Sequence, residues 1–215
     1  MIEWKNEDIA YLARNLAAKG EQYKDAIAHI YKSIDNLGQK RTWTGSNFNV
    51  LAQEMNGVIN NFRSNVVYLQ QTIPQTIYNI AATQAANGGG SLPGMRFYSD
   101  SESIIAVTET VVNQTGDQKI DIDSVRTTIS RDFNGYCESA LTVIGNYYDT
   151  FGQVSSISTD DAIRIMYEEL NTILGNTRKY LQSFQTDIQN VADKSVKNIE
   201  LTNEEALDYA RRLQQ

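Results

Sequence analysis

The residue types that could support catalysis are sparse in this sequence. The chain has a single histidine, His29, which cannot build a metal site of several histidines, and the sequence indicates no Ser-His-Asp relay. His29 lies beside an apolar stripe, as expected of a histidine that is solvated or hydrogen-bonded for structural reasons. The adjacent acidic pairs Glu168-Glu169 and Glu204-Glu205 fit solvated helix faces better than an acid/base pair.

Two other clusters match ligand-binding loops only in part. Asp117, Asp121 and Asp123 lie close together, but they lack the residue order and the closing glutamate of a calcium-binding EF-hand loop. Residues 89–94 have the outer glycine spacing of a phosphate-binding loop, yet Met-Arg follows where that loop requires Lys-Ser or Lys-Thr. We therefore predict no metal, no cofactor and no enzymatic activity.

The composition indicates long helices and argues against some partner classes. The 215-residue chain is 41% hydrophobic and contains only two prolines, a balance that allows one or two packed cores and long uninterrupted helices. The net charge of -7 is spread along the chain without a basic cluster, so nucleic acid is not an expected partner. The single cysteine, Cys137, fits a small buried side chain.

The sequence also bears on localisation. The N-terminal residues contain no basic segment followed by an apolar run, so we expect no cleaved secretory signal peptide. No stretch approaches about 18 consecutive apolar residues, so we expect no stable membrane span. If the protein leaves the cell, it uses a route that does not depend on a cleaved signal.

Apolar residues at helical spacing predict two long helices in the first part of the chain. The first stripe covers residues 9–37 in steps of mostly three and four, with a gap at Gly20, and Gly38 follows in a position favoured for a helix end. The second stripe covers residues 48–80. Pro74 lies inside it, so a kink or local loosening is expected in the turn that ends at this proline.

The turn between these helices carries a Trp-x-Gly pattern, Trp43-Thr44-Gly45. A glycine there allows a positive φ or a close backbone approach. The indole of Trp43 can cover the open end of the helix pair, and the alternative is a place on a recognition surface.

The segment after the first helix pair is predicted to be a linker with one short element. Residues 87–94 are rich in glycine and are typical of a linker. Ser99 and Glu102 match a helix capping box, whereas residues 104–112 are rich in β-branched side chains and also fit a strand. We predict a short helix here.

A second pair of stripes predicts another hairpin in the second half. Its helices are expected to meet at Phe151-Gly152, a break whose aromatic residue and glycine resemble the first turn and suggest a degenerate duplication. Capping residues and carboxylates at residues 158–161 give a strong start signal for its second helix.

Together these elements predict an all-α protein. A single hairpin leaves its outer faces uncovered, so a second hairpin is expected to complete an elongated four-helix bundle. The predicted segments are a hairpin over residues 1–87, a linker region over 88–120, a second hairpin over 121–199, and a short helix over 200–215 that begins at a Thr202 cap.

Residues 1–87 resemble the WXG100, or ESAT-6-like, family of type VII secretion substrates. The resemblance rests on the position of the Trp-x-Gly turn midway in a helical hairpin. The matching residues are Ile2, Trp43, Gly45, Phe48, Leu51 and Met55. The resemblance implies a small helical protein that is exported without a cleaved signal and dimerises into a four-helix bundle.

Members of that family are often followed by a Tyr-x-x-x-Asp/Glu export signal just past the second helix. Tyr98 and Glu102 have this spacing at about that place. Tyr31 and Asp35 have it too, but they lie inside the first predicted helix. The chain departs from the family in its length, since members usually stand alone as a single hairpin, and its second half lacks a Trp-x-Gly turn.

The sequence thus predicts a non-enzymatic, secreted or export-linked binding protein of the type VII class, cytoplasmic before export and secreted or at the cell surface afterwards. Expected partners are the secretion ATPase and either a second copy, as a homodimer, or a related helical protein; the resemblance also implies a virulence-related role. Two alternatives stay open: a coiled-coil component of a surface or phage-like particle, and a membrane-active toxin with residues 104–112 as its apolar tongue.

Overall fold

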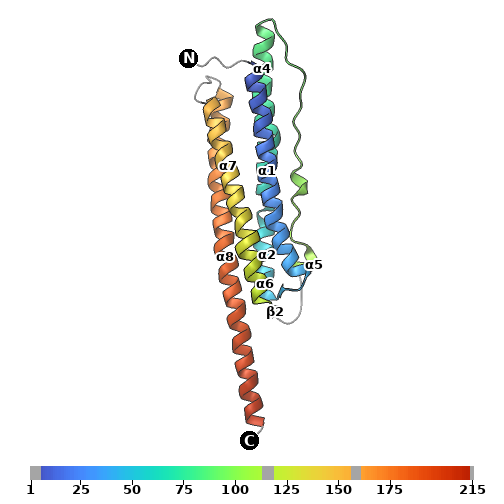
Figure 1. Ribbon diagram of the computed structural model, residues 1–215, viewed down its shortest axis with the longest axis vertical. Helices are drawn as coiled ribbons and strands as arrows, with labels where there is room; N and C mark the ends of the chain where they lie inside the picture. Colours follow the sequence, from blue (N-terminus) through green and yellow to red (C-terminus); the bar gives the residue numbers. More distant parts are fainter. Residues whose placement is uncertain (1–5, 113–118, 156–160, 214–215) are drawn as a thin grey trace. The chain divides into compact units, whose positions relative to one another are not determined.

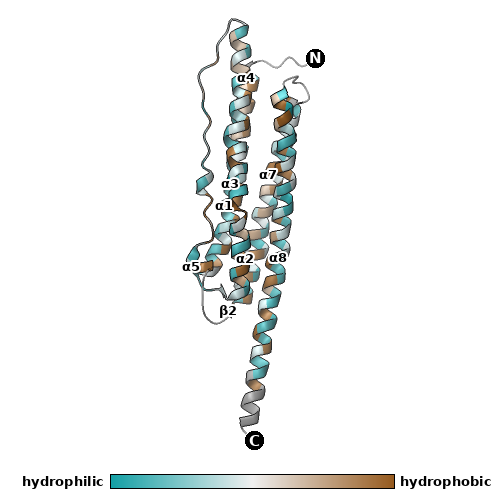
Figure 2. Cartoon of the chain, turned by 180° about the vertical axis from the view of Figure 1, so that it is seen from behind, coloured by the Kyte–Doolittle hydropathy of each residue, from teal (hydrophilic) through white to brown (hydrophobic). Residues whose placement is uncertain are grey.

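The protein is all-α, as predicted (Figure 1). The computed structural model describes residues 6–112, 119–155 and 161–213. Within these ranges the strands form a single two-stranded antiparallel ladder. Figure 2 shows apolar residues interspersed with polar ones along the helices, and no helix in the described ranges has the length and hydropathy needed to cross a bilayer.

Helix α1 runs antiparallel to the rest of the first-half helices, α2 to α4 (Figure 1). The first-half elements are α1 (Asn6–Gln39), β1 (Trp43–Thr44), α2 (Ser46–Gly57), α3 (Ile59–Val67), the π-helical turn η1 (Tyr68–Thr72) and α4 (Ile73–Asn87). The loosening expected before Pro74 is confirmed, because the wider turn η1 ends immediately before α4, whose first turn contains Pro74. A proline has no N–H to donate to the preceding turn, which favours such a local change of helix type.

The region after α4 contains little regular structure. It holds a 3-10 turn, η2 (Ser101–Ser103), a four-residue helix, α5 (Glu109–Val112), and a strand, β2 (Lys119–Ile120), which pairs with β1. No α-helix begins at the Ser99 and Glu102 capping box, where the structure has only the 3-10 turn η2. The short helix of this region is α5, which begins later, after residues 105–108 without regular structure. Asp117 lies outside the described residues.

The second half differs from the prediction at two helix ends. Its elements are α6 (Ile122–Thr127), the π-helical turn η3 (Thr128–Phe133), α7 (Asn134–Ser155) and α8 (Asp161–Leu213). The turn expected at Phe151 and Gly152 is not there, because both residues lie inside α7. Phe151 is fully buried, and a Cβ at Gly152 would lie 3.3 Å from the Tyr167 ring, so this pair serves helix packing rather than a turn.

The C-terminal prediction is also corrected. Thr202 does not begin a separate helix, since α8 continues through it and its hydroxyl donates to the Asn198 carbonyl within the same helix. The start signal at residues 158–161 falls mostly outside the described residues, and α8 begins at Asp161.

The chain divides into two compact units, each assembled from three separate stretches. Unit 1 comprises Met1–Ala28, Asn60–Ile104 and Cys137–Lys179, and unit 2 comprises His29–Ile59, Ile105–Tyr136 and Tyr180–Gln215. Each unit therefore contains helices from both halves of the sequence, and the units cut across the segments that the sequence suggested.

Unit 1 is held together by buried rings and one close helix approach. The Tyr23 and Thr177 hydroxyls are 2.9 Å apart and join α1 to α8, while the Tyr147 hydroxyl of α7 donates to the Leu69 carbonyl at 2.9 Å. A Cβ at Gly20 would lie 3.0 Å from Leu69 and Gln70. The gap in the apolar stripe at Gly20 thus marks a place where two helix backbones come close together.

In unit 2, the last turns of α1 pack against α2 and α5, and α7 contacts α8. The Tyr31 hydroxyl donates to the Met55 carbonyl of α2 at 2.5 Å, and Asn134 accepts a hydrogen bond from Gln185 of α8 at 3.3 Å. Gly38, in the last turn of α1, has no room for a side chain, since a Cβ there would lie 2.2 Å from Val111 Cγ1.

We expect Gly38→Ala to destabilise the protein by roughly 1–3 kcal/mol, because the added methyl group overpacks the contact with Val111. Gly145→Ala is the matched control: Gly145 lies within α7 with open space around its Cβ position, so alanine should be neutral or stabilise by about 0.5–1 kcal/mol. Urea unfolding measures both. A Gly38→Ala variant as stable as the wild type would contradict the packing described.

Candidate functional site

An extended segment of unit 1 lies on its helices, and it contains the predicted export signal. We call residues 91–104 the strap. The strap follows α4 and runs beside α1 and α4 as an extended chain, interrupted only by η2 (Figure 1). Tyr98 and Glu102 both belong to it.

Side chains of α4 hold the first part of the strap by its backbone. The Gln75 carboxamide donates to the Met95 carbonyl at 3.2 Å and accepts from the Phe97 N–H at 3.0 Å. The Tyr78 hydroxyl donates to the Pro93 carbonyl. The Phe97 ring is buried and packs edge-on against the Tyr78 ring, with centroids 6.2 Å apart.

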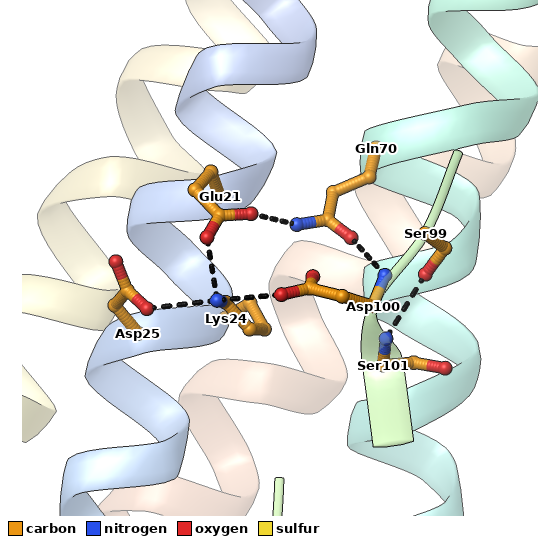
Figure 3. Close-up of polar contacts among 7 residues, drawn as sticks. All are labelled: Glu21, Lys24, Asp25, Gln70, Ser99, Asp100 and Ser101. Carbon is orange, nitrogen blue, oxygen red and sulfur yellow. Dashed lines mark hydrogen bonds and ion pairs between the residues drawn. The ribbon is translucent and has the colours of Figure 1, made fainter. Parts of the chain in front are cut away.

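A buried lysine fixes the middle of the strap (Figure 3). Lys24 of α1 is only 6% exposed, and its ammonium contacts three carboxylates, at 2.5 Å from Glu21, 2.9 Å from Asp25 and 2.8 Å from Asp100. Glu21 and Asp25 are neighbours on α1, whereas Asp100 comes from the strap. The ion pair with Asp100 therefore joins two segments that are far apart in sequence.

Gln70 completes this cluster from the π-helical turn. Its carboxamide donates to Glu21 at 2.5 Å and accepts from the Asp100 N–H at 3.1 Å. The residue is 4% exposed, and both the NH2 and the oxygen of its carboxamide have a partner, so partners on both sides fix its orientation (Figure 3).

The cluster shifts the titration of both charged partners. Desolvation by burial lowers the pKa of Lys24, but hydrogen bonds to Asp100, Glu21 and Asp25 outweigh it and raise the pKa above its usual value. Desolvation likewise acts to raise the pKa of Asp100, but hydrogen bonds from Lys24 and Gln70 outweigh it and lower the pKa. Both groups are therefore charged at neutral pH, as an ion pair requires.

The two residues of the predicted export signal lie at the surface of the strap. Tyr98 is 75% exposed, directly after the buried Phe97. Glu102 is exposed and lies 3.5 Å from Arg63, whose guanidinium also donates to the Ile104 carbonyl at 2.8 Å. Tyr31 and Asp35, the other pair with this spacing, lie within α1.

The Trp-x-Gly turn belongs to unit 2 and is closed to solvent. Trp43 is 0% exposed, its ring lies 5.2 Å from that of Phe48, and its indole N–H donates to the Ser195 hydroxyl at 3.3 Å. Gly45 has a φ of 113°, a value that side chains other than hydrogen rarely allow. In this structure Trp43 covers the turn as an internal plug and presents no surface to a partner.

The residues that the sequence offered as candidates for catalysis or metal binding make contacts that stabilise the fold. The His29 ring stacks on Tyr136 with centroids 4.6 Å apart. Burial, with a smaller contribution from Glu138, raises the pKa of the Cys137 thiol to about 12, so it is protonated at neutral pH. Asp121 accepts from the Ser124 N–H at the start of α6 as a helix cap. In the described part of the chain, no group of three or more histidine, cysteine, aspartate or glutamate side chains is arranged so that it could hold a metal ion.

The two adjacent glutamate pairs of the sequence, Glu168-Glu169 and Glu204-Glu205, both lie on α8. Glu168 accepts from Arg164 one turn earlier in α8 at 2.8 Å, and Glu169 accepts from the Tyr68 hydroxyl of η1. Glu204 and Glu205 are exposed in α8.

Comparison with known proteins gives no match: no protein-family model, no curated protein and no solved structure corresponds to this chain.

Sequence reasoning missed the residues that hold the strap. Lys24, Gln70 and Gln75 are polar side chains outside the apolar stripes, and such residues are expected to face solvent. The available signal was indirect: Gly20 interrupts its stripe where α1 comes close to Gln70. The carboxamides themselves carry no pattern that predicts a bound backbone segment.

We expect Asp100→Asn to lower stability at neutral pH by up to about 1 kcal/mol, the range for partly exposed ion pairs. The folded-state pKa of Asp100 is lowered, so its contribution is complete above its unfolded pKa of about 3.9 and is lost as the pH falls through the folded-state value. The difference between wild type and variant in urea unfolding should therefore disappear in acid.

Asp25→Asn is the control for this experiment. It removes a carboxylate from the same lysine but leaves the link between α1 and the strap, so its cost should be smaller. A difference between wild type and Asp100→Asn that does not change with pH would contradict this account of the cluster.

We expect Trp43→Ala to cost about 3–5 kcal/mol, as for other large buried aromatic side chains, because it empties the space between Phe48 and Ser195. Tyr11→Ala, at a 66% exposed tyrosine, should change the free energy of unfolding by less than about 0.5 kcal/mol. Thermal and urea unfolding measure both. A small cost for Trp43→Ala would show that the turn is not packed as described.

Proposed function

We propose that this protein is a non-enzymatic, exported helical binding protein of the WXG100-like, type VII class, which acts through protein–protein contacts. The observation that carries the proposal is the exposed position of Tyr98 and Glu102 on a strap that directly follows the α1–α4 segment. A receptor can read these two side chains without any rearrangement of the helices.

The first helical segment supports the same class. Trp43-Thr44-Gly45 lies at the turn between α1 and α2, with Gly45 at a positive φ. Apolar side chains just after the turn, Phe48 and Leu51, are buried, and the Phe48 ring lies 5.2 Å from the Trp43 ring. Within the pattern used for the resemblance, Trp43, Gly45 and Phe48 therefore have defined roles in closing this turn.

The strap supports the proposal by its rigidity. A disordered signal loses conformational entropy when it binds, whereas a segment already held at Phe97, Asp100 and Ile104 has lost most of it beforehand. The proposed reader is the secretion ATPase, and the proposed binding partners after export are a second copy or a related helical protein.

The test is an export assay in the organism that encodes the chain. Loss of the type VII ATPase should remove the protein from the culture medium while it accumulates in cells. Tyr98→Ala and Glu102→Gln should reduce export at least several-fold at unchanged cellular levels, because each removes one proposed recognition group without touching the core.

Tyr11→Ala is the matched control, since Tyr11 is also an exposed tyrosine of unit 1 but lies outside the strap. Its export should equal that of the wild type. Export that continues undiminished without the ATPase would overturn the proposed function.

A further inference from the structure

Hydrogen bonds to the first part of the strap alternate along its backbone. The described bonds reach Pro93, Met95 and Phe97 through their carbonyl or N–H groups, all from Tyr78 and Gln75 of α4. In an extended chain, successive residues direct their backbone groups to opposite edges. These odd-numbered residues therefore define an inner edge, which faces α4.

The intervening residues define an outer edge. Gly94, Arg96 and Tyr98 are exposed, and among the described residues no hydrogen-bond partner is found for their N–H or C=O groups. The outer edge is thus a short row of backbone donors and acceptors held in place from behind. Such an unpaired extended edge is a template for pairing with another chain.

We propose that the outer edge of the strap pairs antiparallel with the same edge of a second copy of this chain, about a two-fold axis at Phe97. In this register Arg96 lies opposite Tyr98 of the second copy, and each pair exchanges two backbone hydrogen bonds, which gives four bonds in all.

The side chains of the outer edge favour a second copy of the chain as the partner, and they favour this register. Arg96 and Tyr98 are two residues apart, so they project from the same face of the strap, and the antiparallel pairing brings each arginine against a tyrosine ring. A two-fold axis at Arg96 would instead oppose two arginines. The outer edges of two copies are thus complementary in charge as well as in backbone geometry.

Two features make the edge suited to pairing. Gln75, Tyr78 and the Lys24 cluster already fix the strap, so ordering costs little on association. Pro93, which has no N–H to donate, belongs to the inner edge, where its carbonyl accepts from Tyr78. Its missing donor therefore removes nothing from the outer row. This contact uses Tyr98, which the proposed export signal also uses. Its test needs only the purified chain, so the pairing can fail while the proposed function stands, and the export assay can fail while the pairing stands.

The test is sedimentation velocity of the purified full-length chain over a wide concentration range. The wild type should form a reversible dimer. Tyr98→Pro removes the N–H of Tyr98 from the outer edge and keeps an extended backbone, so the dissociation constant should rise about tenfold or more. Tyr98→Ala keeps this N–H and should weaken the dimer less.

Met95→Pro is the matched control, because the Met95 nitrogen lies on the inner edge and donates no described hydrogen bond. It should dimerise like the wild type. Circular dichroism checks that each variant is folded. Hydrogen exchange on the wild type adds a measurement without mutation: the Arg96 and Tyr98 amides should exchange more slowly at high protein concentration, whereas the Phe97 amide should not change.

A wild type that stays monomeric at all concentrations overturns the proposal. So does a dimer that Tyr98→Pro leaves undiminished, since that dimer uses another surface. Equal loss of dimer in Tyr98→Pro and Met95→Pro also overturns it, because the effect would then not be specific to the outer edge.

Discussion

An extended chain that lies on a helix must find hydrogen-bond partners for its backbone, and the helix has none to offer because its own N–H and C=O groups bond within it. The strap meets this constraint through side chains. The carboxamides of Gln75 and Gln70 replace the backbone of a neighbouring strand, while the Tyr78 hydroxyl and the Arg63 guanidinium take single carbonyls. The path of the strap, and the exposure of Tyr98 on it, follow from where these side chains stand along the helices.

The Lys24 cluster shows how a buried charge is made tolerable in the same place. An ammonium group has three N–H donors, and Lys24 directs them to three carboxylates. Glu21 and Asp25 come from its own helix, so only the contact with Asp100 depends on the strap being in position. Three carboxylates exceed one ammonium by two charges. Each carboxylate remains about half exposed, so water solvates the excess negative charge.

The sequence predicted what depends on periodicity and on backbone restriction. The helical stripes gave the all-α class, Pro74 marked the π-helical turn, and Gly45 marked a positive φ. The prediction failed at Phe151-Gly152 because the same two residue types can close a turn or pack a helix against a ring, and only the position of Tyr167 decides between them. The contacts of the strap could not be predicted either, since they join polar side chains to the backbone of a distant segment without any repeating spacing.

Because backbone groups alternate between the two edges of the strap, the way the strap is attached determines which edge can pair with another chain. The bonds that Tyr78 and Gln75 make to the strap all satisfy its inner edge and leave the outer edge to water. Proteins usually protect such edges with proline or with charge, but Pro93 lies on the inner side, so the charge of Arg96 is the protection that the outer row carries. A single cation repels a like charge and attracts an aromatic face. The outer edge is therefore closed to a neighbour that places a cation opposite Arg96 and open to one that places a tyrosine there.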